Sequence, residues 1–357
     1  MPQLFGKNHS AEELRHSSAT MAQFAGIRLY ELADGKARGM RCADVYTGSG
    51  LRFQVFIDRA MDIGATEFAG VPVAWVHPAL GTPDQYEPHG YDWGRTWGGG
   101  LVTTCGLTFF GQPELDEHER LGLHGRIAHT PAEKVRVTEQ WRGDDYVLQI
   151  SGQARQVVPG GENLLLTRTI STRLGATALT VDDVVRNEAF KPTPHMILYH
   201  CNFGFPVVSP SSELLVDDEW VRPRDERAQR GFHLHTKFEQ PAPDYPEQVF
   251  FHKPRVGADG MVSAAIVNRH MGFGVYVRYR AAELPCMAQW KQMSRGAYVC
   301  AIEPANQWET PRRVLREEGR LYYMAPGEEI AYHLELGILP DSPSIRHFEE
   351  KYLLRGA

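Results

Sequence analysis

The sequence lacks the features of several large classes of protein. It has no run of about 18 consecutive apolar residues, the length that a membrane-spanning helix requires. Its first residues, MPQLFGKNHS, hold one lysine and no apolar stretch, unlike a secretory signal. Basic runs are absent, and 38 Lys and Arg against 44 Asp and Glu give a formal charge of −6. We therefore expect no membrane partner and no nucleic-acid partner.

Cysteine is also scarce. No C-x-x-C motif occurs, and the five cysteines lie far apart: Cys42, Cys105, Cys201, Cys286 and Cys300. An odd number at wide spacings is not typical of a disulfide framework or a zinc site. We therefore predict buried free thiols and a cytoplasmic protein.

Several catalytic motifs are missing. There is no G-x-S-x-G elbow, no Walker A motif and no G-x-G-x-x-G, since the glycines at 98–100 precede no helical pattern. His118, His124 and His129 lie near acidic residues, but spacings of six and five fit no compact metal site. We expect no metal and no cofactor.

What the sequence does have is alternation of apolar and polar residues. Eight stretches show a period of two and are rich in Val, Ile, Leu, Tyr and Thr: 51–58, 134–141, 146–157, 163–172, 178–188, 272–280, 296–304 and 328–339. Turn residues separate these stretches, and no helical pattern alternates with them. The pattern predicts an all-β fold, a large antiparallel β-sandwich or barrel, built as a single domain over residues 1–357.

Short helices are expected only at the two ends. Ser10 and Glu13 have capping-box spacing at the start of 10–24, and Ser342-Pro343 precedes apolar residues at helical spacing. The polar stretch 209–247 is expected to be a long excursion over the surface.

Four segments place ionisable residues among apolar residues or glycines. In the first, Gly122 to Arg126, His124 and Arg126 point to one face of an extended segment and could clamp an anion or sugar hydroxyls. A solvated surface turn is the alternative. In the second, His200 follows an apolar run and precedes a Gly/Pro-rich exit, where a site often lies. A satisfied core histidine explains it equally well.

The other two segments hold carboxylates. Glu303 closes an apolar strand that Pro304 is expected to end; a buried carboxylate is costly unless it is paired or functional. The alternative is an edge-strand glutamate that faces solvent. Asp58 and Asp62 flank Arg59 after a strand, which fits a salt-bridged turn as well as a substrate contact.

Together these segments resemble the aldose 1-epimerase (galactose mutarotase-like) superfamily, and in particular a divergent bacterial branch of formerly unknown function. The segments that carry the resemblance span about residues 45–340: DRAMDIG at 58–64, GLHGRIA at 122–128, LYHCNFGFP at 198–206 and AIEPAN at 301–306. The resemblance implies a β-supersandwich with short terminal helices and a sugar-binding cleft on one concave sheet.

The resemblance also implies a chemistry, the interconversion of the anomers of a free sugar. A carboxylate takes the anomeric hydroxyl proton while a histidine protonates the ring oxygen; the ring opens, the aldehyde rotates and closure gives the other anomer. Matched motif by motif, His200 is the acid, Glu303 is the base, and His124 supports the substrate. The pKa of histidine lies near the operating pH, and burial can tune a carboxylate toward it.

Further residues are candidates for substrate binding. Trp290 and Lys291 could supply a stacking face and a hydroxyl or anion donor, or they could be a buried Trp beside a solvated Lys. Arg126 stands where related mutarotases carry a second glycine, and with Arg59 it could clamp an acidic group. We therefore expect an acidic or otherwise unusual sugar. Arg95 is a candidate for the family's early arginine by position alone.

Other functions remain open. The same acid and base could serve a keto-sugar isomerase or lyase, and a non-catalytic carbohydrate-binding protein could keep the cleft. The expected partner is a small-molecule sugar, in carbohydrate catabolism. A monomer or a homodimer is expected, the latter if Trp93 and Trp97 are exposed aromatic residues.

Overall fold

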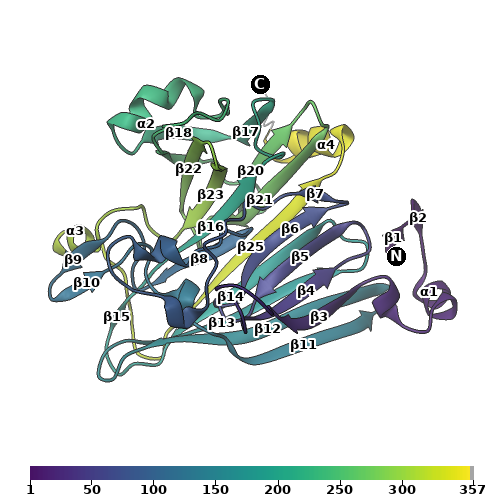
Figure 1. Cartoon of the computed structure of the whole chain (residues 1–357), viewed down its shortest axis with the longest axis horizontal. Coiled ribbons are helices and arrows are strands. Elements are labelled where there is room, and N and C mark those ends of the chain that lie inside the picture. Colours follow the sequence, from purple (N-terminus) through teal and green to yellow (C-terminus); the bar gives the residue numbers. More distant parts are fainter. Residues whose placement is uncertain (354–357) are drawn as a thin grey trace.

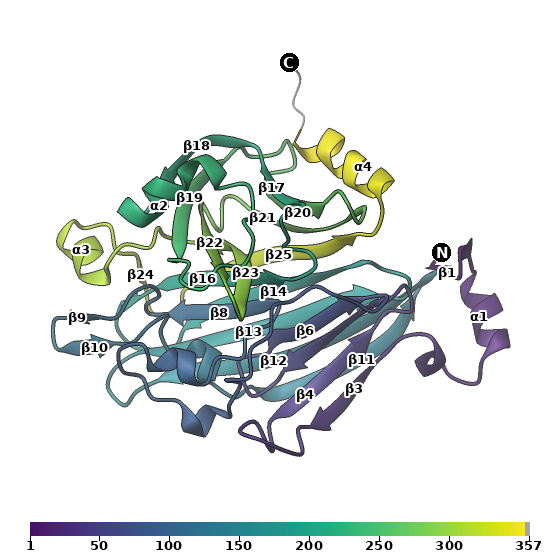
Figure 2. The same ribbon diagram turned by 45° about the horizontal axis from the view of Figure 1, so that its top comes forward.

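Two large antiparallel sheets make up most of the molecule (Figures 1 and 2). The computed structural model describes residues 1–353. The first sheet has eight strands in the order β11-β12-β13-β14-β25-β21-β20-β17. Their bounds are Glu133–Arg142, Asp145–Val157, Asn163–Arg173, Ala178–Asn187, Glu329–Leu339, Phe273–Arg280, Met261–Asn268 and Ser212–Val216.

The second sheet has eleven strands and carries the candidate site. Ten of them follow the order β18-β19-β22-β23-β16-β8-β6-β5-β4-β3, and β7 (Val71–Pro72) pairs with β6. Their bounds are Asp218–Pro223, Gln248–Pro254, Cys286–Ser294, Ala297–Ala305, Met196–Gly204, Val102–Leu107, Asp62–Phe68, Leu51–Phe56, Arg41–Tyr46 and Gly26–Glu31.

The remaining elements are short. Small two-stranded pairs are β1 (Gln3–Leu4) with β2 (Lys7–Asn8), β9 (Glu114–Asp116) with β10 (Glu119–Leu121), and β15 (Thr193–Pro194) with β24 (Tyr323–Met324). The α-helices are α1 (Ala11–Ser17), α2 (Glu226–Gly231), α3 (Arg312–Glu317) and α4 (Ser342–Tyr352). Within residues 1–353, no helix combines the length and the apolar character needed to cross a bilayer.

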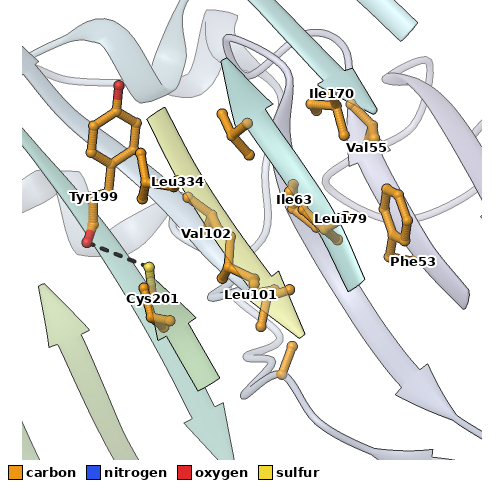
Figure 3. Packing of buried hydrophobic residues seen from close by; sticks show 14 of the residues in the cluster. Phe53, Val55, Ile63, Leu101, Val102, Ile170, Leu179, Tyr199, Cys201 and Leu334 are labelled. Carbon is orange, nitrogen blue, oxygen red and sulfur yellow. Dashed lines mark hydrogen bonds between the residues drawn. The ribbon is translucent and has the colours of Figure 1, made fainter. Parts of the chain in front are cut away.

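The sandwich follows from the alternation in the sequence. In β12 every second residue is buried from Tyr146 to Gln156, so one face of the strand packs inward and the other meets solvent. One apolar core joins residues of both sheets, among them Phe53 and Val102 of the eleven-stranded sheet and Ile170 and Leu334 of the eight-stranded sheet (Figure 3). The predicted all-β sandwich is confirmed, and all eight predicted strands are present.

A buried ionic cluster also joins the sheets. Arg168 of β13 lies 2.6 Å from a carboxylate oxygen of Asp183 and 3.0 Å from one of Asp62 in β6. Tyr199 of β16 donates to Asp183 at 2.7 Å, from the core side of the strand that carries His200. Asp62 is therefore a structural residue, as is Asp58, which pairs with Arg41 at the sheet edge.

The structure adds detail to one expectation about local structure and corrects another. The stretch 209–247 is mostly exposed or half-buried, as expected, but it contains regular elements: β17, which pairs with β20, and β18 and α2, which lie beside β19 (Figures 1 and 2). The helix expected over 10–24 ends at Ser17, and Thr20 then caps a separate 3-10 turn at Met21–Gln23. Its start was right, since the Ser10 hydroxyl accepts from the Glu13 amide at 3.1 Å.

Candidate active site

A pocket of about 820 Å³ opens on the face of the eleven-stranded sheet that points away from the sandwich core. Strands β16, β22 and β23 form its floor, and loop segments around residues 91–97, 122–124 and 224–230 form its walls. In β16, Tyr199 and Cys201 pack into the inter-sheet core, so His200 between them points to the pocket. Figure 3 shows Tyr199 and Cys201 on that core side.

His200 and Glu303 meet at the bottom of this pocket. The two strands pair with Cys201 opposite Ile302, which places His200 directly across from Glu303. Nε2 of His200 lies 3.1 Å from Oε1 of Glu303. Neither residue ends its strand: β16 runs on to Gly204, and β23 continues through Pro304 to Ala305. The expected strand ends were therefore wrong, but the two side chains do come together.

The contact between His200 and Glu303 leaves polar atoms of both residues without a hydrogen-bond partner among residues 1–353. Although Nε2 and Oε1 are at hydrogen-bonding distance, Oε1 of Glu303 has no aligned hydrogen-bond partner within the described part of the chain. Nδ1 of His200, Nδ1 of His124 and Nε1 of Trp93 are likewise buried without a partner among residues 1–353. Buried polar atoms are rarely unpartnered, and these four lie on residues that line one pocket. A ligand rich in hydroxyl groups could satisfy them.

Aromatic rings surround His200. The ring centroids of Trp97, Trp290 and His124 lie 5.4, 5.5 and 5.7 Å from that of His200, each edge to face. The indole N–H of Trp97 donates to Thr103 at 3.0 Å, which fixes one wall. Such flat, partly apolar walls suit the apolar faces of a sugar ring.

The turn that carries His124 depends on the glycines beside it. His124 itself has a φ of 56°, and Gly125 has a φ of 74°. A Cβ on Gly125 would lie 2.3 Å from the carbonyl oxygen of Phe109, so only glycine fits there. The His124 amide donates to Gly111 O at 3.0 Å, and the ring is directed to the pocket.

Burial shifts the pKa values of the three central groups in opposite directions. Burial, with a contribution from Glu309, raises the pKa of Glu303 to about 8. Burial lowers the pKa of His200 to about 4 and that of His124 to about 3. At neutral pH both shifts favour uncharged groups, which places the one exchangeable proton of the His200–Glu303 pair on the carboxyl group.

Sequence reasoning missed a polar group on the pocket wall. Arg224, just after β18, binds Glu247 at 3.0 Å and Glu309 at 3.2 Å, and the indole N–H of Trp290 donates to Glu247 at 3.0 Å. Arg224, Glu247 and Glu309 come from separate loops without a shared motif, so no local signal marks them. Trp93 and Trp97 were noticed, but as exposed residues; Trp93 is 2% exposed and both line the pocket.

The predicted site residues divide into two groups. His200, Glu303, His124 and Trp290 line the pocket. Arg59, Arg126, Lys291 and Arg95 are not among its lining residues.

The environments of three of these residues explain why. The Arg59 guanidinium is buried and donates to the carbonyl oxygens of Gly81 and Thr96. Lys291 follows Trp290 in β22 and so points to the opposite face, where its ammonium group pairs with Glu239. Arg95 is exposed and pairs with Asp92.

Two other expectations concern the cysteines and a possible metal site. All five cysteines are free and buried, as predicted. Over residues 1–353, no three His, Cys, Asp or Glu side chains gather in an arrangement that could hold a metal ion, and this includes the histidines at 118, 124 and 129.

The fold and sequence were compared with known proteins. Residues 37–338 match the family described as "Domain of unknown function (DUF4432)". A "putative aldose 1-epimerase" from Klebsiella pneumoniae subsp. pneumoniae is 24% identical, with a TM-score of 0.86 over 91% of this chain and 86% of that one. A comparison with curated proteins gave no match.

Two more distant structures share the architecture. A galactose mutarotase-like protein from Clostridium acetobutylicum is 13% identical, with a TM-score of 0.57 over 88% of this chain and 99% of that one. Galactose 1-epimerase from Lactobacillus acidophilus is 11% identical, with a TM-score of 0.57 over 88% and 98%. At these identities the likeness establishes the fold. The chain therefore belongs to the DUF4432 family, and it has the fold of these aldose 1-epimerase and galactose mutarotase-like structures.

Proposed function

We propose that the protein is a sugar mutarotase, which interconverts the α and β anomers of a free sugar. The observation that carries the proposal is the contact between His200 and Glu303 on the floor of the pocket, 3.1 Å from Nε2 to Oε1. The anomeric hydroxyl oxygen and the ring oxygen of a sugar are bonded to the same carbon. An acid and a base that serve these two oxygens must therefore lie side by side, as these two groups do.

The proton balance of the pair fits a reversible ring opening. In the opening step the Glu303 carboxylate takes the anomeric hydroxyl proton and the His200 imidazolium gives a proton to the ring oxygen. The C1–O5 bond breaks and an aldehyde forms. Ring opening therefore starts from the less favoured arrangement, with the proton on His200, and ends in the one that the pKa values favour, with Glu303 protonated and His200 neutral. After the aldehyde turns over, both protons return and the ring closes on the other face.

The pocket carries other arginines than those on which the expectation of an acidic sugar depends. Arg126 and Arg59 do not line it. The wall instead carries Arg224, whose charge is already met by neighbouring carboxylates, together with Arg227 and Arg230 of the α2 segment. The proposal therefore covers free sugars in general, and the substrate panel includes neutral and acidic members.

Anomeric exchange measured by NMR saturation transfer tests the proposal. The wild type should speed α/β exchange of at least one sugar in the panel, and Glu303→Gln should lose about 10²- to 10⁴-fold of that rate while still binding the sugar. Glu283→Gln is the matched control, because Glu283 also has a pKa raised by burial but does not line the pocket. It should keep the wild-type rate.

Other results would overturn the proposal. New resonances without faster anomeric exchange would indicate an isomerase or a lyase that uses the same pair. Sugar binding with no turnover in any sample would indicate a carbohydrate-binding protein. Equal losses in the Glu303 and Glu283 variants would show that the effect comes from the fold.

A further inference from the structure

A belt of hydrogen-bonded side chains runs along the wall of the pocket. In order it links Tyr91, Gln112, Glu309, Arg224, Glu247 and Trp290. The bonds measure 3.0, 3.5, 3.2, 3.0 and 3.0 Å in that order. All six residues line the pocket. They come from distant parts of the chain, so the belt fixes several loops relative to one another.

Arg224 is the central member of this belt. It is the only cation among the six, and it joins the carboxylates of Glu309 and Glu247. Its side chain is 20% exposed, so its charge is only partly screened by water. The remaining members on either side are uncharged. The electrostatic balance of the belt therefore depends on one arginine and two glutamates.

The charges of Arg224, Glu247 and Glu309 act on a third carboxyl group, that of Glu303. The ionisable groups around Glu303 come from every element that forms the pocket: His200, His124, Arg224, Glu247, Glu309, and Asp225, Glu226, Arg227 and Arg230 of the α2 segment. The thiols of Cys105 and Cys201 lie buried nearby. His200 and His124 are neutral at pH 7. Within the belt, Glu309 and Glu247 oppose ionisation of Glu303 and Arg224 favours it.

We propose that Arg224 is a positioning residue that sets the protonation of Glu303, through a belt in which its charge balances those of Glu247 and Glu309. The inference rests on the proposed role of Glu303 as a base. It assigns Arg224 a task other than anion binding: the carboxylates of Glu247, Glu309 and Asp225 already contact the guanidinium, which holds the belt together and keeps the ionised form of Glu303 within reach of neutral pH.

A titration that needs no turnover tests this inference. Protein labelled with ¹³C at the glutamate side-chain carboxyl carbon is titrated by NMR, and the Glu303 signal is assigned as the one missing in Glu303→Gln. The pKa of Glu303 should rise in Arg224→Met by at least half a pH unit, a threefold change in proton affinity. It should fall in Glu309→Gln by a similar amount. The double variant should lie between the two.

Arg224→Lys separates charge from structure. Lysine keeps the positive charge but cannot bridge both carboxylates as the planar guanidinium does. It should restore the Glu303 pKa to within about half a unit of the wild type. If instead it behaves like Arg224→Met, the geometry of the belt rather than its charge sets the pKa, and the inference fails.

Activity then distinguishes this inference from the proposed function. The limb of the pH–rate profile for anomeric exchange that reports Glu303 should move with the NMR pKa, in opposite directions for Arg224→Met and Glu309→Gln. Unchanged or parallel pKa shifts in the two variants overturn the inference, whatever the activity. Opposite pKa shifts in a protein without exchange activity would uphold the electrostatic coupling and overturn the mutarotase proposal. If Arg224→Met fails to fold, Glu309→Gln is the deciding variant, because it retains a hydrogen-bonding side chain.

Discussion

Nε2 of His200 and Oε1 of Glu303 lie 3.1 Å apart because two neighbouring strands pair in a register that sets the residues opposite each other. The contact needs no loop to close and no helix to move. Both groups are nearly inaccessible to water, at 4% and 5% exposure, so each avoids charge where it can. Because the pKa of Glu303 is about 8 and that of His200 about 4, the one proton of the pair rests on the carboxyl group, and the proposed ring opening needs it on His200.

The raised pKa of Glu303 predicts how stability changes with pH. A carboxyl group whose pKa rises on folding to about 8 contributes stability that is present below its unfolded pKa, near 4.5, and that is lost as the pH rises through 8. The unfolding free energy of the wild type, relative to Glu303→Gln, should therefore fall by at least about 1 kcal/mol between pH 5 and pH 9. Urea unfolding of both proteins at the two pH values measures the difference, and a constant difference would show that Glu303 ionises as freely as in the unfolded chain.

The strands and part of the site could be predicted from the sequence, because both leave local patterns in it. Period-two alternation marks strands that have one face in the core and one in solvent, such as β12. β16 carries no such pattern, because all nine of its residues are buried, yet the motif around His200 identified it. Motifs are local, and the residues that they single out, His124, His200 and Glu303, line the pocket.

The rest of the site depends on contacts that no local pattern records. Arg224 and Glu309 are ordinary loop residues in the sequence and meet only when the sheet is assembled. Arg59 shows the opposite case: it was expected, with Arg126, to clamp an acidic group, but its donors are used by backbone carbonyl groups. Which arginine lines the pocket is decided by how each one is buried and bonded in the folded chain, and the residue type does not show this.

The ionic cluster between the sheets predicts a large loss of stability. Arg168→Met removes the cation that contacts both Asp62 and Asp183 and leaves two buried carboxylates. The variant should lose about 3–5 kcal/mol of unfolding free energy at pH 7. Arg186→Met is the matched control, since Arg186 pairs with Glu329 at the surface, and it should lose less than about 1 kcal/mol. Urea unfolding compares them; similar losses in both variants would contradict the role of the cluster.

The turn at His124 predicts that a single methyl group will disturb the site. In Gly125→Ala the new Cβ collides with the Phe109 carbonyl oxygen, in a backbone conformation that favours glycine. We expect a loss of more than about 2 kcal/mol of unfolding free energy and weaker sugar binding, because His124 must shift. Gly143→Ala has a similar φ but open space around it, and should cost only about 1 kcal/mol with sugar binding intact. Denaturant unfolding and a sugar-binding isotherm of both variants supply the comparison.

Lys291 was expected to bind substrate, but the structure places it outside the pocket, and this difference can be tested. Its ammonium group donates to Leu234 O at 2.9 Å and pairs with Glu239 at 2.5 Å, on the face of β22 opposite Trp290. Lys291→Met should therefore cost stability, about 3 kcal/mol or more, because Glu239 loses the cation on its buried side. The double variant Lys291→Met/Glu239→Gln should recover much of that loss.

The same variant separates a structural lysine from one that binds substrate. If Lys291 holds the segment around Glu239 against the sheet, KM for the sugar in Lys291→Met stays within about twofold of the wild type at a temperature where the variant is folded. Trp290→Ala, which removes a wall of the pocket from the neighbouring position, should instead raise KM by about 5- to 150-fold, since a ring that packs on a sugar is worth about 1–3 kcal/mol. A large rise in KM for Lys291→Met together with full stability would place the lysine in the binding site after all.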